Sequence, residues 1–189
     1  MYFRESELRE FATQATQDGA FATLRKDATT AYGPFDVFVS HSVRDAWVVL
    51  GIRQMLESQG LKVYVDWIDD KQMDRSSVSP ATADRLRRRM TESRSLIYAT
   101  SRAASKSRWM PWELGYFDGR KGPDQVAILP IESDSTVGFV GQEYIGLYKV
   151  IEKVLDGDSL RAFAVQNDQK RAQLLKSFAT GSGQFYGLR

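Results

Sequence analysis

The sequence predicts an α/β fold in which helices cover both faces of a parallel sheet. Short apolar runs at 35–40, 61–66 and 95–100 are typical of strands, and segments with apolar residues at helical spacing separate them. These runs are almost continuously apolar, as expected for parallel strands that are buried on both faces. The chain has 189 residues, of which 42% are hydrophobic and 26% charged, a composition typical of one globular domain with small additions.

The first 34 residues are expected to form a helical extension. Apolar residues at 8–15 lie at helical spacing, and the segment 20–24 either continues this helix or begins a second one. Gly33-Pro34 is a dipeptide typical of loops and marks the predicted boundary with the main domain. We therefore expect residues 1–34 to add no strand to the central sheet, and to pack on the domain or mediate self-association.

The main domain is expected to span 35–155 and to contain five parallel strands. In the loop after its first strand, Ser42 and Asp45 form a predicted helix-capping box. The expected elements, in chain order, are a strand at 35–40, a helix through 48–56, a strand at 61–66, a polar stretch at 67–80, a basic helix at 81–91, a strand at 95–100, a helix that opens near Pro111, and strands at 126–131 and 144–147. A C-terminal segment at 156–189 is expected to close the chain with one or two helices packed on this domain.

The composition argues against several kinds of site. The chain has no cysteine and a single histidine, so neither a disulfide nor a histidine-rich metal site is expected, and a cytoplasmic location fits better than a secreted one. A net charge of +2 is too small to indicate nucleic-acid binding. No apolar run is long enough for a signal peptide or a membrane span. We therefore expect no metal, nucleic-acid or membrane partner.

A ligand site is predicted at the carboxyl ends of the strands. If the strands take the order 2-1-3-4-5, the order reverses between the first and the third strand, and ligands of such sheets bind at that point. Both strand ends are polar, because Ser40, His41 and Ser42 end the first and Ser101 and Arg102 follow the third. The site is therefore expected in the crevice between these two ends.

A carboxylate, Glu113, is expected beside this crevice. Proline is favoured at the first position of a helix, so Pro111 predicts that the helix begins there and that Glu113 lies in its first turn. The helix dipole stabilises a first-turn carboxylate, which gives Glu113 a purely structural explanation. Trp109 likewise has a structural explanation, since large aromatic side chains mostly fill cores. Position alone leaves the structural and the functional explanation of both residues open.

Four segments, in this order, resemble a Toll/interleukin-1 receptor (TIR) domain. Residues 35–42 with Asp45 resemble its first strand and the following loop, and residues 63–67 resemble its second strand leading into a long connecting loop. Residues 107–114 (SRWMPWEL) resemble its tryptophan-x-x-x-glutamate segment, and residues 126–131 resemble its fourth strand. The resemblance covers about residues 35–155 and implies a flavodoxin-like, five-stranded parallel sheet.

The resemblance also implies an enzyme activity. Many bacterial, plant and some animal TIR domains cleave NAD+ at the nicotinamide–ribose bond, and the glutamate of that segment is their catalytic residue. Carried over, the catalytic residue of this chain is Glu113 and the matching tryptophan is Trp109. NAD+ is then the substrate and not a cofactor, and the products are nicotinamide and either ADP-ribose or a cyclic ADP-ribose isomer.

This chain departs from the commonest pattern of the family at two places. Met110 and Trp112 stand where a cysteine and a tyrosine are usual. The loop at 67–80 lacks the usual proline-glycine turn and carries Asp69 and Asp70 near its start. In relatives this loop gates the site and mediates head-to-tail assembly. Because the usual turn is missing, the sequence assigns neither function to the loop of this chain.

The polar and aromatic residues at the crevice are the expected contacts of the substrate. His41 fits a satisfied polar residue at a strand end equally well, and Ser42 fits a helix cap better than a contact. The expected substrate-binding residues are Ser40, His41, Asp66, Trp67, Ser101 and Trp109. Residues 84–108 hold eight lysines and arginines against two acids. Of these, Arg102, Lys106 and Arg108 lie where a pyrophosphate could bind, whereas the arginines within 81–91 are interpreted as a solvated helix face.

The sequence thus predicts a single TIR domain with helical additions that consumes NAD+ to make a nucleotide signal. Stand-alone bacterial TIR proteins of this size resemble the sensor half of the Thoeris type of anti-phage defence, in which a separate effector reads the signal. A phage-derived component is the expected activator. One alternative is a non-catalytic adaptor that binds other TIR domains and needs no acid at Glu113. Another is a nucleoside-transferring enzyme that forms a covalent intermediate on a carboxylate.

Overall fold

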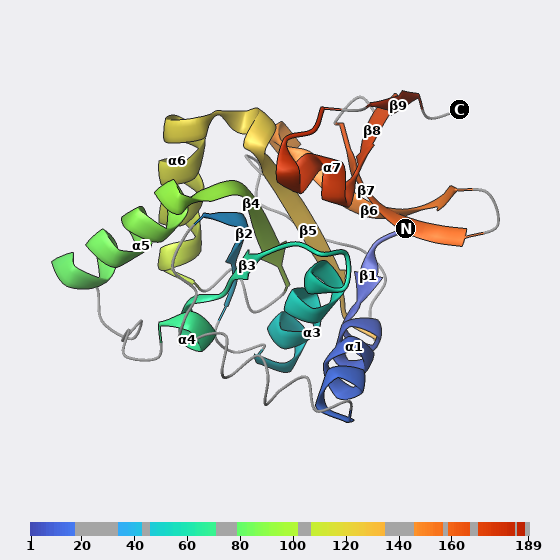
Figure 1. Ribbon diagram of the computed structural model, residues 1–189, viewed down its shortest axis with the longest axis horizontal. Coiled ribbons are helices and arrows are strands. Elements are labelled where there is room, and N and C mark those ends of the chain that lie inside the picture. The colour runs from blue at the N-terminus through green and yellow to red at the C-terminus, as the bar shows by residue number, and fades with distance from the viewer. Residues whose placement is uncertain are drawn as a thin grey trace.

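A central sheet with helices on both faces forms the body of the molecule (Figure 1). The structure is a computed structural model that describes residues 1–17, 34–42, 46–70, 79–101, 107–134, 146–156, 159–166, 170–183 and 185–187. Within these ranges, no helix has both the length and the apolar character needed to cross a membrane.

The parallel part of the sheet has the predicted strand order. Its strands, in spatial order, are β3 (Val63–Tyr64), β2 (Phe35–Ser40), β4 (Ser93–Thr100), β5 (Val126–Glu132) and β6 (Lys149–Asp156). Each neighbouring pair is parallel. In chain order this arrangement is 2-1-3-4-5, so the predicted α/β class is confirmed. The fifth strand is not at the predicted 144–147 but begins at Lys149, where charged residues alternate with apolar ones and weaken the strand signal.

Helices form a layer on each face of the sheet. One layer contains α1 (Glu5–Gln17), α3 (Ala46–Glu57) and α7 (Leu175–Thr180), and the other contains α5 (Pro80–Glu92) and α6 (Trp109–Lys121). The short elements α4 (Asp66–Asp69) and η3 (Pro123–Gln125) lie in connections. In β2, Val37 and Val39 pack with α3, whereas Phe38 packs with α5 and α6. Because side chains of a strand alternate between faces, Ser40 lies on the α6 side.

The N-terminal extension contributes a strand, so the prediction that it contributes none is wrong. β1 (Phe3–Arg4) pairs in parallel with the end of β5, at Ile131 and Glu132. β6 pairs with β5 at Ala127 and Ile128 alone, and the carbonyl of Met1 accepts a 2.8 Å hydrogen bond from the backbone N–H of Lys153 in β6. The extension therefore completes the sheet beside β5 and β6. A strand of two residues has no periodicity that a sequence could reveal.

The C-terminal segment contains strands as well as a helix, so the prediction of closing helices is wrong in part. β7 (Ser159–Val165) forms a hairpin with β6, and β8 (Arg171–Leu174) and β9 (Tyr186–Gly187) continue the sheet in antiparallel fashion. In β7, Phe163 and Val165 pack in one cluster and Ala164 in another, on opposite faces. The apolar residues at 160, 163 and 164 fit the period of a helix as well as that of a strand. The pairing with β6 determines that this segment is a strand.

The predicted N-terminal helix is present as α1, which packs closely on α3. A Cβ atom added to Gly51 of α3 would lie 1.7 Å from the carbonyl oxygen of Leu8, so only glycine allows this approach. The side chains of Leu8 and Ala12 are fully buried at the contact. The possible second helix at 20–24 lies outside the described residues. The predicted capping box at Ser42 cannot be placed, because its partner Asp45 also lies outside them.

Candidate active site

Glu113 and Ser40 meet in a buried contact at the carboxyl edge of the sheet. The Ser40 hydroxyl donates a 2.6 Å hydrogen bond to Oε2 of Glu113, and both residues are 0% exposed. A hydrogen bond from a neutral hydroxyl to a carboxylate at this distance is short and strong. A carboxylate without contact to water is costly to bury unless hydrogen bonds compensate it, and Ser40 supplies one such bond.

The topology of the chain explains why these two residues meet. Ser40 is the last residue of β2, and its register partner on the neighbouring β4 is Tyr98, two residues before that strand ends. α6 follows β4 and covers the same face of the sheet, packing with Phe38 and Tyr98. Glu113 lies one helical turn after Trp109 on the inward side of α6. The predicted crevice between the first and third strands is therefore where the carboxylate lies.

Glu113 does not lie in the first turn of its helix, so that prediction is wrong. α6 begins at Trp109, and Ser107 accepts a 3.3 Å hydrogen bond from the backbone N–H of Met110 at the helix start. Pro111 is the third residue of the helix, where its missing N–H has no partner to lose. Glu113 is thus the fifth residue. The favourable effect of the helix dipole is confined to the first turn, so it does not account for this carboxylate.

His41 and Asp66 form a second buried pair beside this contact. Nδ1 of His41 lies 3.0 Å from the carbonyl oxygen of Val39, and Nε2 lies 3.3 Å from Oδ1 of Asp66. The two residues are 1% and 2% exposed. The pair joins the end of β2 to the start of α4, so His41 is buried at the strand end, and its assignment as a substrate contact stays a prediction.

The acids after β3 anchor α4, which sequence reasoning did not predict. Asp69 accepts hydrogen bonds from the backbone N–H of Val65 (2.6 Å) and from Nη1 of Arg53 on α3 (3.1 Å). Burial raises the pKa of Asp69 above its ordinary value, while the Arg53 guanidinium acts to lower it. The one sequence signal was Arg53, a charged residue on the otherwise apolar face of a helix.

Asp70 continues this anchor toward the other face of the sheet. It accepts hydrogen bonds from the Tyr64 hydroxyl (2.8 Å) and from Nε of Arg89 on α5 (3.0 Å). Burial acts to raise the pKa of Asp70, but the hydrogen bonds from Arg89 and Tyr64 outweigh it and hold the pKa below its ordinary value. Two of the aspartates that replace the usual turn of this loop therefore fix its start. Residues 71–78 of the loop expected at 67–80 lie outside the described part of the chain.

The tryptophans near Glu113 have separate positions. Trp109 is 6% exposed and packs in the core between α6 and the sheet, so it has the structural position considered for it. Its ring meets that of Trp112 edge-on, with centroids 5.5 Å apart. Trp112 is half-buried toward α5, where the guanidinium of Arg87 lies 5.4 Å from its ring centroid. Trp112, which stands where the family usually has a tyrosine, therefore contributes to the packing of α5 against α6.

Two further predicted contacts lie at the same edge of the sheet. Ser101 is half-buried and follows directly after the last residue of β4. Trp67 is the second residue of α4, and its side chain lies outside what the structure describes. Of the predicted pyrophosphate contacts, Arg102 and Lys106 also lie outside it, and Arg108 is exposed at the start of α6.

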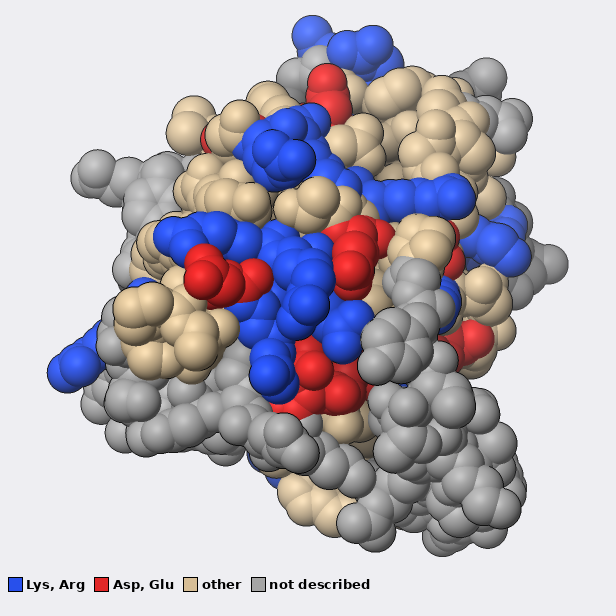
Figure 2. All heavy atoms as spheres, turned by 60° about the vertical axis from the view of Figure 1, so that its left-hand side comes forward, with Lys and Arg blue, Asp and Glu red and all other residues tan. Residues whose placement is uncertain are grey.

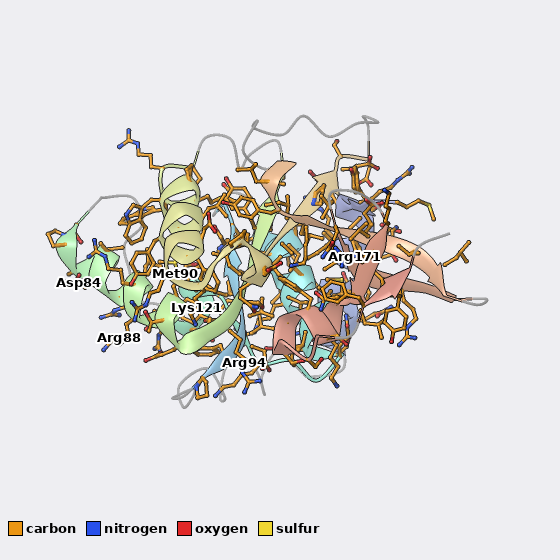
Figure 3. The ribbon with its side chains drawn as sticks, turned by 90° about the horizontal axis from the view of Figure 1, so that it is seen from above. Asp84, Arg88, Met90, Arg94, Lys121 and Arg171 are labelled. Carbon is orange, nitrogen blue, oxygen red and sulfur yellow. The ribbon has the colours of Figure 1, made fainter. Side chains whose placement is uncertain are left out.

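The basic helix predicted at 81–91 is α5, and its arginines are mostly engaged. Figure 2 shows lysine and arginine side chains gathered over the face that α5 and α6 present, with acidic side chains among them. Arg87 pairs with Asp84 at 2.7 Å. Figure 3 shows Arg88 on the outer side of α5, whereas Met90 points toward α6. Arg87 and Arg88 are exposed as the sequence predicts, whereas Arg85 and Arg89 are half-buried and pair with Asp70, so the predicted solvated face is wrong for these two.

The fold and this site define a class of protein: a doubly wound α/β domain with a buried carboxylate at the carboxyl edge, opposite the end of its first strand. A family model described as TIR domain matches residues 37–156, so the chain belongs to the TIR domain family. The resemblance found in the sequence is therefore confirmed.

Two curated proteins are similar to this chain. One, from Bacillus cereus (strain MSX-D12), is named probable 3' cyclic ADP-D-ribose synthase ThsB' and is 52% identical over 120 residues, which are 63% of this chain and 61% of that protein. The other, from Cytobacillus dafuensis, is provisionally named cyclic ADP-D-ribose synthase TIR2 and is 30% identical over 83 residues, 43% of this chain and 22% of that protein. The matches cover less than two thirds of the length of either relative.

Proposed function

We propose that this protein cleaves the nicotinamide–ribose bond of NAD+ and releases nicotinamide together with a cyclic ADP-ribose isomer or ADP-ribose as a signal. The observation that carries the proposal is the buried contact of Glu113 with Ser40 at the carboxyl edge of the sheet. The names of the two relatives, both cyclic ADP-D-ribose synthases, support the same substrate class.

The chemistry requires one negative charge beside the ribose. As the bond between the nicotinamide nitrogen and the ribose carbon breaks, its electron pair returns to the pyridinium ring, so nicotinamide leaves neutral and needs no acid. The ribose becomes an oxocarbenium-like cation, which the carboxylate of Glu113 stabilises. The Ser40 hydroxyl holds one carboxylate oxygen in place. Ser40 is therefore a positioning residue in this proposal, and no longer a direct substrate contact.

The burial of the site bears on which product forms. Water gives ADP-ribose when it captures the cation and loses a proton, whereas a nucleophilic group of the same molecule gives a cyclic isomer. Glu113 and Ser40 have no exposed surface in this closed state, so a site that closes again over bound NAD+ admits little water. We therefore expect the cyclic isomer to exceed ADP-ribose among the products.

The same burial requires an opening step before NAD+ can bind. Glu113 and Ser40 are 0% exposed, so NAD+ reaches the carboxylate only after a rearrangement at this edge of the sheet. An activator, such as a phage component in a Thoeris-type system, would act by favouring the open state. The signal would then pass to a separate effector protein in the cytoplasm.

The direct test is NAD+ turnover by the purified protein, followed by liquid chromatography and mass spectrometry. We expect nicotinamide and a product with the mass of cyclic ADP-ribose, with a larger yield when lysate of phage-infected host cells is added. Synthetic ADP-ribose and cyclic isomers serve as standards. Absence of nicotinamide at high protein concentration, with and without infected lysate, would support the non-catalytic adaptor instead. A glycosyl group trapped on a carboxylate would support the nucleoside-transferring alternative.

Replacement of Ser40 by alanine is expected to lower kcat without much change in KM. Without the hydroxyl, Glu113 loses a hydrogen bond to a charged group, which corresponds to a loss of about tenfold to a hundredfold in rate. Nicotinamide release over a range of NAD+ concentrations separates the two parameters. The matched control is Ser95→Ala, because Ser95 is equally buried but donates to the carbonyl of Asp36. A rise in KM alone for Ser40→Ala would return Ser40 to the set of direct substrate contacts.

A further inference from the structure

We propose that a groove beside α1 binds a short peptide segment of a partner protein. The groove has a volume of about 740 Å³, and its walls come from β1, α1, the end of α3, the strands β6, β7 and β8, and α7. It lies against the α1 and α3 layer of the sheet, whereas Glu113 lies on the α6 layer. We call it the α1 groove. It is separate from the candidate active site, and the proposal does not depend on NAD+ cleavage.

The floor of the α1 groove is apolar. Its apolar lining residues include Phe3 of β1, Phe11 of α1, Met55 of α3 and Ala162 of β7. Phe11 and Ala162 are partly buried against the main core. Apolar side chains at the bottom of an open groove favour an occupant that can bury apolar groups of its own.

The two walls of the groove carry opposite charges. Glu7 and Glu10 project from α1, and Lys153, Arg161 and Lys176 lie opposite, on β6, β7 and α7. Glu7 and Lys153 join the walls through contacts of 2.6 and 2.8 Å. Glu10, Arg161 and Lys176 are exposed at the rims. An occupant of matching charge therefore carries an acidic group toward Lys176 and a basic group toward Glu10.

These features fit a peptide better than a nucleotide. The residues of α1 that line the groove run from Glu7 to Gln14, a length of about 10 Å at the rise of an α-helix. The groove is partly open to solvent, whereas small-molecule sites usually enclose most of their ligand. The exposed side-chain amide of Gln14 can pair with the backbone of an extended chain. A polyanionic nucleotide would instead meet the carboxylates of α1.

The test is a selection of random dodecapeptides, displayed on filamentous phage, against the immobilised full-length protein. Selected peptides are then synthesised with a fluorescent label and measured by fluorescence anisotropy. We expect apolar peptides that carry one acidic and one basic residue and bind with a Kd of about 1–100 µM. Lys176→Glu is expected to weaken binding at least tenfold, and changing the acidic residue of the peptide to lysine is expected to restore it.

A second variant and a control make the outcome independent of any one substitution. Glu10→Lys, on the opposite rim, is expected to weaken the same peptides if Lys176→Glu disturbs folding. Arg88→Glu changes a charge on the outer side of α5 and is expected to leave binding unchanged. Circular dichroism verifies that each variant is folded. Peptides that bind both groove variants as well as the original protein, or a selection without any peptide below about 100 µM, would overturn the proposal. Neither outcome bears on NAD+ cleavage.

Discussion

Glu113→Gln is expected to abolish NAD+ turnover while the protein keeps its fold. Glutamine has the same size, and its side-chain oxygen can still accept the hydrogen bond from Ser40. The substitution removes only the negative charge that the oxocarbenium-like state requires. Loss of one such electrostatic group typically costs about 10²–10³ in rate. Nicotinamide release under single-turnover conditions measures the chemical step directly.

The stability of the same variant separates a catalytic from a structural carboxylate. A carboxylate that is 0% exposed has lost its contact with water, so replacing it by a neutral amide is expected to leave the melting temperature unchanged or raise it. A structural carboxylate would show the opposite pattern, with lower stability and full turnover. Asp118→Asn on the same helix is the matched control, because Asp118 accepts a hydrogen bond from Tyr148 away from the contact with Ser40. That variant is expected to remain active.

The sequence predicts the central part of the fold because its strands are buried on both faces. β2, β4 and β5 are nearly continuous in apolar residues, and the helices α3 and α5 have clear apolar periodicity. The same strand and helix signals also predict that Ser40 and Glu113 lie near each other. Once the strand order is known, the end of β2 and the start of α6 must lie at one edge.

The parts that the sequence does not predict depend on distant partners. β1 consists of two residues and exists because the end of β5 offers free backbone groups. β7 has apolar residues that suit a helix or a strand, and only its hairpin with β6 decides between them. The anchoring by Asp69 and Asp70 likewise depends on arginines 16 and 19 positions away along the chain. Local periodicity carries no information about such partners.

Gly51→Ala is expected to destabilise the protein although alanine is the better helix former. The added Cβ would lie 1.7 Å from the carbonyl oxygen of Leu8, and a backbone atom inside a helix cannot move aside without the whole of α1. Alanine gains about 1 kcal/mol of helix propensity, but α1 must withdraw and expose apolar surface around Leu8 and Ala12. We expect a net loss of about 1–3 kcal/mol. For a chain of this length, that corresponds to a drop in melting temperature of roughly 2–12 °C.

The control is the same substitution at a helical glycine with free space around it. A Cβ added to Gly115 or Gly119 of α6 would meet nothing within 4 Å, so Gly115→Ala and Gly119→Ala are expected to raise the melting temperature slightly. Limited proteolysis provides a second measurement, since α1 should be cleaved faster in Gly51→Ala than in either control. If Gly51→Ala instead raised the melting temperature as the controls do, α1 would not be held against α3 at this glycine. The N-terminal wall of the α1 groove would then be placed wrongly as well.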